Sequence, residues 1–441
     1  MLQATVRRDG SSRFGSNNKY GVFPSVSVGW NVMNEAFMED TREWLNNFKV
    51  RFSWGKNGND NIGDFRYTVL TQGGNNYGFG TSVIKEQISS KASGLANPNL
   101  KWEESEQFDY GVDFGFLNNS LTLTLDYFIK KTNGMLKEMN IPSYVGESKP
   151  IGNVGDMKNS GVEIELGYKW AAAGGWNFGV KANASYLKNE LIKLGNAAGF
   201  ETYDNVSNLG NISRAEAGQP FPYFWGYKTD GIFQNWAEVE AHKSSEGKVI
   251  QPDARPGFVR FVDINDDGVI DDSDRTKLGK GTPDWTFGIT FNTSWKGIDF
   301  MMFWQGTQGN EIFDASRRLD LPNINLPSYY LSRWTGEGTS NKYPIYIQGD
   351  ATNWQASDLY VHDGSYLRLK NIELGYTLPQ NLTKKAFINR FRVYFACENL
   401  LTFTKYYGFD PEISSAATSC GVDFGVYPQP RTLKVGANIT F

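Results

Sequence analysis

Apolar and polar residues alternate with a period of two over many stretches of this chain. Residues 119–131 place leucines and a tyrosine on one face and threonines with an aspartate on the other. Residues 160–170 and 176–186 repeat the scheme, and the last stretch carries it to Phe441. Because successive side chains of a β-strand point to opposite faces, this period predicts strands with one apolar and one polar face.

The pattern predicts an all-β chain with about twelve long strands, each of the length that crosses a bilayer in a transmembrane barrel. These strands are expected near residues 2–9, 22–31, 48–56, 105–117, 120–131, 159–170, 176–188, 284–295, 298–307, 364–377, 390–401 and 430–441. Alternation alone does not separate a barrel from a soluble sandwich, because the apolar face of a barrel looks outward and that of a sandwich looks inward.

The connections between the predicted strands alternate in length. Tight turns follow the fourth, sixth and eighth strands, at 117–119, 171–175 and 296–297. Long links rich in Gly, Asn, Asp and Trp follow the third, fifth, seventh, ninth and eleventh. Outer-membrane barrels have short periplasmic turns and long extracellular loops, so this parity favours a barrel and places the end of the last strand on the periplasmic side. Two periplasmic links are longer, at 32–47 and 379–389, and the first has room for a short helix.

Composition supports the barrel. The chain has 13 Trp, 22 Tyr, 30 Phe and 47 Gly, and several aromatic residues fall near predicted strand ends. Aromatic girdles and glycine-tolerant strands both suit a barrel wall. The sequence has no run of 18 apolar residues, so no transmembrane helix is predicted.

Other classes of protein find little support. A formal net charge of −4 gives no basic face for nucleic acid. The only cysteines, Cys397 and Cys420, argue against a disulfide scaffold, although a single bridge between them stays open. His242 and His362 are too few for a histidine-rich metal site, and the motifs of nucleotide-binding enzymes, serine hydrolases and zinc proteases are missing. We therefore expect a protein that is not an enzyme.

The start of the chain lacks a secretion signal. Met1 is followed by LQATVRRDGSS, without the apolar segment and the cleavage site that export requires. An outer-membrane protein must be exported, so either the chain is not one or its true N-terminus is missing.

Eight segments together carry a specific resemblance. They are ATVRRDGSSRFG from Ala4, YGVFPSVSVGW from Tyr20, VRFSWGKNGN from Val50, NPNLKWEESE from Asn97, NVGDMKNSGV from Asn153, GYKTDGIF from Gly226, residues 261–279, and DGSYLRLKNIELGY from Asp363. In this order they resemble the SusC/RagA family of TonB-dependent outer-membrane transporters, over essentially the whole chain.

The resemblance implies more than the pattern does. Such transporters carry a signal, a TonB box, a plug domain and an antiparallel transmembrane barrel of about 22 strands. Residues 1–441 correspond to the C-terminal part of that barrel, so TonB would be reached only through the missing N-terminal part. The resemblance thus implies that Met1 is an internal methionine or the start of a truncated reading frame. Residues 189–283 and 308–363 are expected to be long extracellular loops.

The resemblance also implies partners and a location. The chain would lie in outer-membrane lipid beneath a SusD-like surface lipoprotein that covers the extracellular mouth. Phe441, a terminal aromatic on the last strand, is the usual assembly mark of such barrels.

An acidic stretch between the predicted strands has the spacing of a calcium loop. Six acids and one asparagine fall within twelve residues, and Gly268 stands at the sharp turn. The expected oxygen ligands are Asp263, Asn265, Asp267, the Val269 carbonyl, Asp271 and Asp274. A structural Ca²⁺ is predicted because so many acids repel one another without a cation; an acidic turn without an ion is the alternative.

Aromatic residues concentrate in the long loops, where binding residues are commonly found. The candidates for substrate contact are Tyr223, Trp225, Tyr227, Trp236, Trp334 and Trp354, with the pairs Tyr329-Tyr330 and Tyr406-Tyr407 as weaker versions. Aromatic faces stack on sugar rings and pack against peptides, so either ligand fits. The alternative is that these residues pack loop against loop or contact a partner protein.

The leading hypothesis is TonB-dependent uptake of a large nutrient, an oligosaccharide or a peptide. Two alternatives remain at this point, a calcium-stabilised all-β surface protein that binds glycans, and a passive porin.

Overall fold

The computed structural model describes the chain except for residues 75, 80–84, 207–208, 317–324, 348–351 and 414. Its main element is an antiparallel sheet of 12 strands in the order β1-β2-β3-β8-β9-β12-β13-β20-β21-β24-β25-β27. The strands are β1 (Leu2–Gly10), β2 (Tyr20–Asn31), β3 (Leu45–Asn59), β8 (Glu103–Phe116), β9 (Leu121–Asn133), β12 (Gly155–Ala172), β13 (Trp176–Leu194), β20 (Trp285–Trp295), β21 (Ile298–Gln308), β24 (Tyr366–Thr377), β25 (Arg390–Thr404) and β27 (Thr432–Thr440). All twelve predicted strands are confirmed, and most run further than predicted.

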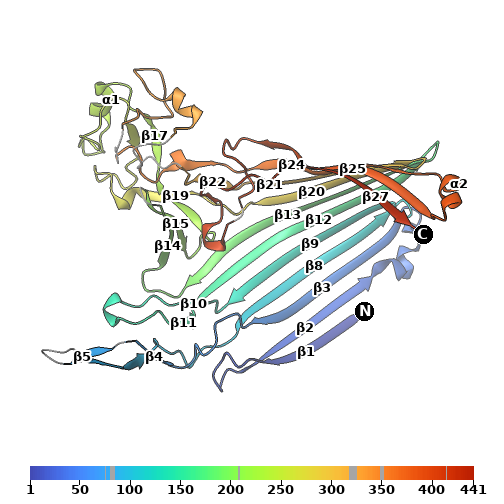
Figure 1. Ribbon diagram of the computed structural model, residues 1–441, viewed down its shortest axis with the longest axis horizontal. Coiled ribbons are helices and arrows are strands. Elements are labelled where there is room, and N and C mark those ends of the chain that lie inside the picture. Colours follow the sequence, from blue (N-terminus) through green and yellow to red (C-terminus); the bar gives the residue numbers. More distant parts are fainter. Residues whose placement is uncertain (75, 80–84, 207–208, 317–324, 348–351, 414) are drawn as a thin grey trace. The chain divides into compact units, whose positions relative to one another are not determined.

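The chain divides into two compact units. Unit 1 comprises Met1–Tyr168, Ser185–Phe200 and Glu216–Gln219, and unit 2 comprises Lys169–Ala184, Glu201–Ala215 and Pro220–Phe441. In unit 1, β1, β2, β3, β8 and β9 lie side by side (Figure 1). Short pairs lie beyond one end of these strands: β4 (Thr71–Gly73) with β7 (Ser90–Ala92), β5 (Tyr77–Phe79) with β6 (Lys85–Gln87), and β10 (Leu136–Glu138) with β11 (Ile151–Asn153).

The tight turns have the backbone that their residues allow. Leu117, Asn118 and Asn119, between β8 and β9, have φ of 53°, 56° and 60°. Asparagine tolerates this left-handed region better than most residues. Between β20 and β21, Lys296 and Gly297 have φ of 43° and 88°, which is the two-residue hairpin turn that matches the twist of the flanking strands. These local choices fix the register of both hairpins.

Unit 2 carries its own folded loops. A four-stranded sheet has the order β14 (Phe200–Val206), β15 (Gly210–Glu216), β16 (Tyr223–Tyr227) and β19 (Arg275–Gly279), and β17 (Thr229–Ile232) pairs with β18 (Val259–Phe261). A three-stranded sheet joins β23 (Val361–Asp363), β22 (Glu311–Asp314) and β26 (Val422–Asp423), and its β22–β26 pair is parallel. Their core buries Ile212, Phe224, Phe313, Tyr360 and Val422.

The helices that the described residues form are short. They are α1 (Trp236–Ala241), α2 (Gln380–Thr383) and the 3-10 turns η1 (Val32–Asn34), η2 (Ala36–Thr41), η3 (Ser143–Val145), η4 (Asp272–Asp274), η5 (Ser328–Ser332), η6 (Asp358–Tyr360), η7 (Lys384–Ala386) and η8 (Ala417–Ser419). None of the helices within the described residues has the length and apolar character to cross a membrane. The short helix for which the 32–47 link has room is present as η1 and η2.

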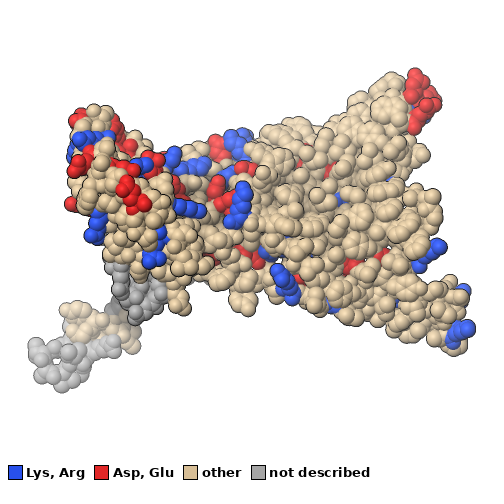
Figure 2. Space-filling model, turned by 90° about the horizontal axis from the view of Figure 1, so that it is seen from above, with Lys and Arg blue, Asp and Glu red and all other residues tan. Residues whose placement is uncertain are grey.

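The two faces of the large sheet differ as the alternation predicts. On one face of unit 1, Val112 lies opposite Leu125 and Phe114 opposite Leu123. On the other face, Asp113 lies opposite Thr124. Figure 2 shows a broad area of surface that carries few Lys, Arg, Asp or Glu side chains.

Candidate functional site

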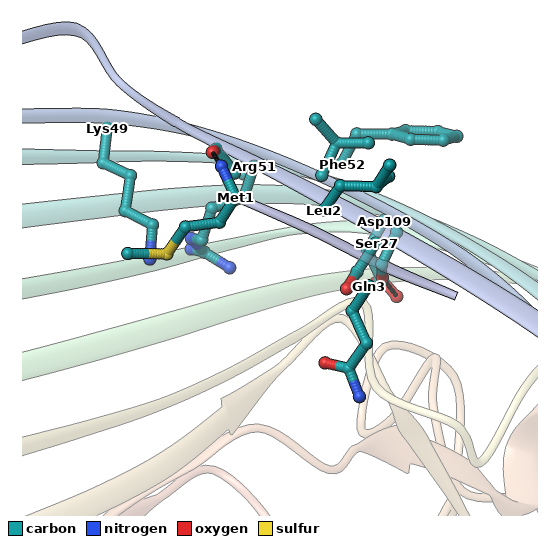
Figure 3. Close-up of a pocket in the computed structure, with 12 residues that line it drawn as sticks. Met1, Leu2, Gln3, Ser27, Lys49, Arg51, Phe52 and Asp109 are labelled. Atoms are coloured by element: carbon teal, nitrogen blue, oxygen red, sulfur yellow. Dashed lines mark hydrogen bonds between the residues drawn. The ribbon is translucent and has the colours of Figure 1, made fainter. Parts of the chain in front are cut away.

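The polar face of unit 1 is hollowed between β1, β2, β3 and β8. A cavity of about 420 Å³ there is lined by Gln3, Ser27, Lys49, Arg51 and Asp109, among others. Figure 3 shows the polar side chains Lys49, Arg51 and Gln3 on the side of the strands opposite to Phe52. The hollow exists because small residues, including Ser27 and Gly29, leave space between longer charged ones.

A second cavity continues along the same face. It measures about 430 Å³ and shares Gln3, Ser27 and Asp109 with the first. It adds Thr5 and Arg7 of β1. The two cavities together form a trough (hereafter the polar trough), whose lining combines hydroxyl, amide and charged groups with apolar atoms.

Arg51, which lines the trough, also connects the strands of the polar face. Its Nε donates to Asp113 Oδ2 at 2.8 Å, and its Nη2 donates to Asp113 Oδ1 at 3.0 Å and to Asp126 Oδ2 at 3.2 Å. These contacts join β3, β8 and β9. Gly111 makes room for them, since a Cβ there would lie 2.3 Å from Asp126 Oδ1. One guanidinium therefore fixes three neighbouring strands with charge-assisted bonds.

Unit 2 contains a similar cluster at Arg392. Its guanidinium bonds Asp299 of β21 and Glu373 of β24, with Nε to Asp299 Oδ1 at 3.0 Å. Gly375 again leaves the space, because a Cβ there would meet Arg392 Nη2. Sequence reasoning missed both clusters, since each needs three strands in register. The only sequence signal for these clusters was the recurrence of charged residues at the polar-face positions of the predicted strands.

A buried ion pair attaches the link after β25 to β24. Arg368 Nη2 donates to Asp410 Oδ1 at 2.5 Å and Nη1 donates to Glu412 Oε2 at 2.8 Å, while Lys370 Nζ also bonds Glu412. Arg368 and Asp410 are buried. Burial alone would raise the pKa of Asp410, but backbone N–H groups of Gln429 and Glu412 and the Arg368 guanidinium bind the carboxylate and hold that pKa below its ordinary value.

The predicted calcium loop is folded by its own side chains. Asp263 accepts from the N–H groups of Asp266 and Gly268, both at 2.7 Å. Asp267 accepts from Val269 at 2.9 Å, and Asn265 accepts from Asp267 at 3.1 Å. Gly268 has φ +78°, as the sharp turn requires. The first half of the loop therefore curls around its side-chain oxygens.

The second half of the loop ends in a capping box. Asp271 and Asp274 cap η4 reciprocally, and Asp274, which is fully buried, also accepts from the Ile264 N–H at 2.8 Å. Within the described residues, no three Asp, Glu, His or Cys side chains converge closely enough to hold a metal ion. The oxygen donors fit Ca²⁺ by type, and Ca²⁺ binding stays a prediction.

The six predicted aromatic residues occupy different environments in unit 2. Tyr223, Tyr227 and Trp354 are buried, whereas Trp225 and Trp334 are half-buried. The Arg214 guanidinium lies 4.2 Å from the centroid of the Trp225 ring. Trp236, at the start of α1, is 61% exposed. Trp354 belongs to one hydrophobic cluster of unit 2, and Tyr227 and Trp334 belong to another. Contact of the six residues with substrate stays a prediction.

Two tyrosine pairs from distant parts of unit 2 meet. The Tyr329 ring lies 4.8 Å from that of Tyr407 and 5.0 Å from that of Tyr343. His362 lies 4.7 Å from Tyr407, whose hydroxyl donates to Asp314 Oδ2 at 2.5 Å. We call these four rings the tyrosine–histidine cluster. Sequence reasoning singled out the tyrosine pairs but not His362, because nothing local links it to them.

Unit 2 also contains a mainly apolar cavity of about 370 Å³. Tyr227, Phe261 and Ile250 contribute to its wall, and Gln355 adds a polar group. Tyr227 is the one predicted substrate residue that lines it.

A model of one protein family matches this chain over residues 1–400. Its description is "TonB dependent receptor-like, beta-barrel". The chain belongs to this family.

Relatives and solved structures agree with the assignment. The chain is 32% identical to TonB-dependent receptor P3 of Formosa agariphila, over 99% of this chain and 43% of the relative. It is 29% identical to TonB-dependent receptor SusC of Bacteroides thetaiotaomicron, over 100% of this chain and 42% of SusC. The structure of the RagAB peptide transporter matches with a TM-score of 0.79 and 27% identity, over 100% of this chain and 45% of that one. The chain thus spans less than half the length of the relatives it matches.

The family decides how the two faces of the sheet are oriented. The protein is a β-barrel protein of the outer membrane, so the apolar face meets lipid and the polar face, with its trough and its arginine clusters, lines the interior. This excludes the soluble sandwich. Phe441 follows β27 and is exposed, and its role in assembly stays a prediction. Both cysteines are free thiols.

Proposed function

We propose that this chain forms part of a TonB-dependent transporter that takes up a large nutrient, an oligosaccharide or a peptide. The observation that carries the proposal is that the whole of this chain matches a part of SusC and a part of the RagAB peptide transporter. TonB would act through a plug and a TonB box that lie outside these residues. A SusD-like lipoprotein is the proposed partner at the extracellular loops.

The polar trough and the tyrosine–histidine cluster support this proposal. The trough offers hydrogen-bonding groups on the interior face of unit 1. The cluster offers aromatic rings in the loops of unit 2, with Tyr329 stacked on Tyr343 and Tyr407 partly exposed. Aromatic stacking combined with polar groups is a common way to bind sugars and peptides.

Uptake by cells tests the proposal. A strain lacking the gene is compared with the same strain complemented by the full-length gene, using fluorescent oligosaccharides and peptides above the size that porins pass. We expect uptake only in the complemented strain, and only when TonB is present. Uptake that continues without TonB would support a passive porin and overturn the proposal.

Affinity purification of the full-length protein from outer membranes tests the proposed partner. We expect a surface lipoprotein to co-purify in stoichiometric amount. A substitution in the loops, Trp236→Ala, should weaken its recovery if α1 contributes to the contact. Isolation of the protein alone from mild detergent would overturn the partnership.

We also propose that the loop from Asp263 to Asp274 binds a structural Ca²⁺. Its supporting observation is the folding of the loop around side-chain oxygens of Asp263, Asn265 and Asp267. Calorimetry with CaCl₂ should show binding to the wild type, none to Asp267→Ala and unchanged binding to Asp253→Ala, an exposed acid outside the loop. Identical null titrations for all three proteins would refute it.

A further inference from the structure

The link between β2 and β3 exposes aromatic residues. It contains η1 and η2 and lies at the end of these strands opposite to the β4 and β10 pairs (Figure 1). Val32 and Met33 are buried, whereas Phe37 is 68% exposed and Trp44 is 56% exposed. Large apolar side chains exposed together usually mark a surface that contacts something other than water.

These aromatic residues continue a row that begins on the strands. Phe37 packs edge-on against Trp30 at the end of β2, with 6.4 Å between ring centroids. Trp44 stacks on Phe116 of β8 at 6.1 Å, and Phe116 stacks on Phe114 at 6.0 Å. Phe114 and Phe116 belong to the apolar face, which meets lipid. The link therefore extends the lipid-facing surface beyond the strands.

The row lies at one boundary of the apolar band. Toward the other end of β8, Phe108 shares the same face and packs against Trp54, whose Nε1 donates to Glu106. The distance from Phe108 to Phe116 spans roughly 20 Å of membrane height at ~3.4 Å per residue and a tilt of ~40°. That is close to the ~25 Å height of the lipid-facing band of such barrels. Phe116, and with it Trp44, thus lies at the membrane–water boundary.

The polar groups of the link are also those expected at the membrane–water boundary. Trp30 Nε1 donates to Glu35 Oε1 at 2.9 Å, so this indole has an apolar body and a polar edge, as interfacial tryptophans do. The link is also acidic, because residues 31–44 carry Glu35, Glu39, Asp40 and Glu43 against one base, Arg42. The negative charge of the link repels anionic headgroups, so binding to anionic lipid is disfavoured.

We infer that the link from Asn31 to Trp44 is a membrane-interface anchor, with Phe37 and Trp44 inserted among the headgroups of zwitterionic phospholipid. The anchor would hold β2, β3 and β8 at a fixed depth in the bilayer. It depends on the barrel being in the outer membrane and is independent of what the protein transports.

Depth-dependent quenching tests the anchor. The full-length protein, with Cys397→Ala and Cys420→Ser, receives an environment-sensitive fluorophore at Phe37→Cys or, as matched control, at Glu39→Cys on the same short helix. Both proteins are reconstituted in phosphatidylcholine vesicles. We expect shallow spin-labelled lipid to quench the Phe37 label severalfold more than the Glu39 label, and aqueous iodide to show the opposite order. Heat-modifiable mobility confirms that each variant is folded.

Three results would overturn the inference. Equal iodide quenching at both positions would place Phe37 in water. A shielded Phe37 label that appears only after a second protein is added would assign the surface to a protein partner. Insertion that requires phosphatidylglycerol and fails in phosphatidylcholine would contradict the lipid class.

Discussion

In the strands of unit 2, Ile289 and Phe395 remain 42% and 48% exposed, whereas in the loops of the same unit Ile312 and Phe313 are fully buried. The strand residues face lipid, which replaces a protein core as their apolar surrounding. The loop residues face water and have to build a core of their own. Within one unit, apolar side chains thus point outward to lipid in the strands and inward to a protein core in the loops.

Charged side chains also differ between the strands and the loops, in the partners to which they bond. In the strands, charged groups such as Arg392 lie on the interior face and pair across neighbouring strands. In the loops, the acidic groups mostly accept from nearby backbone N–H groups, as Asp263 does. Strand charges therefore fix register between segments. Loop charges fix local backbone shape, except where Asp410 and Glu412 pair with Arg368 of β24.

The largest effect is expected in the loop core. Trp354→Ala removes a buried indole from the packed cluster around Tyr330 and should lower the free energy of unfolding by about 4 kcal/mol. Trp236→Ala removes an exposed ring and should change it by less than about 0.5 kcal/mol. Urea unfolding in vesicles measures both. Equal losses would show that the loops lack a core of their own.

The next effect concerns the link between loop and strand. Arg368→Met leaves the buried carboxylate of Asp410 without its cation and should cost about 3 kcal/mol. It should also make the segment after β25 sensitive to protease. Lys405→Met serves as control, because Lys405 lies 3.8 Å from Asp363 and is exposed. Similar proteolysis of both variants would contradict the role of Arg368.

The orientation of the strands predicts a smaller effect. Leu125→Arg places a charge in lipid and should cost about 2 kcal/mol. Thr124→Arg, one position away, faces the carboxylates of Asp113 and Asp126 and should cost much less. Urea titrations of the two variants in vesicles compare them. A larger loss at Thr124 would mean that the two faces have been assigned the wrong way round.

The smallest effect is a dependence on pH. Because the folded chain holds the pKa of Asp410 below its ordinary value, its ionised form stabilises the fold above the unfolded pKa of about 3.9. This stability is lost as the pH falls through the folded value. Pepsin digestion at decreasing pH should release the segment after β25 below about pH 4. Cleavage that does not change with pH would show that Asp410 is dispensable.

The sequence was sufficient to predict the strands of the large sheet, but not the structure of the loops. The period of two and the turn at Lys296 and Gly297 are local signals, so all twelve strands could be predicted. The parallel pairing of Phe313 with Val422 joins segments far apart in the chain, and no local pattern announces it. For the same reason the loop aromatics could be recognised as a group, but not sorted into the buried Trp354 and the exposed Trp236.

The sequence by itself determined the strands, the two faces of each and the family, because alternation, turn residues and motifs are written along the chain. Only the tertiary structure decided which residues meet across it. Arg51 reaches Asp113 and Asp126, Tyr329 reaches Tyr407, and Trp44 reaches Phe116. Each of these contacts depends on the register of several strands or the packing of distant loops, which a local pattern does not encode.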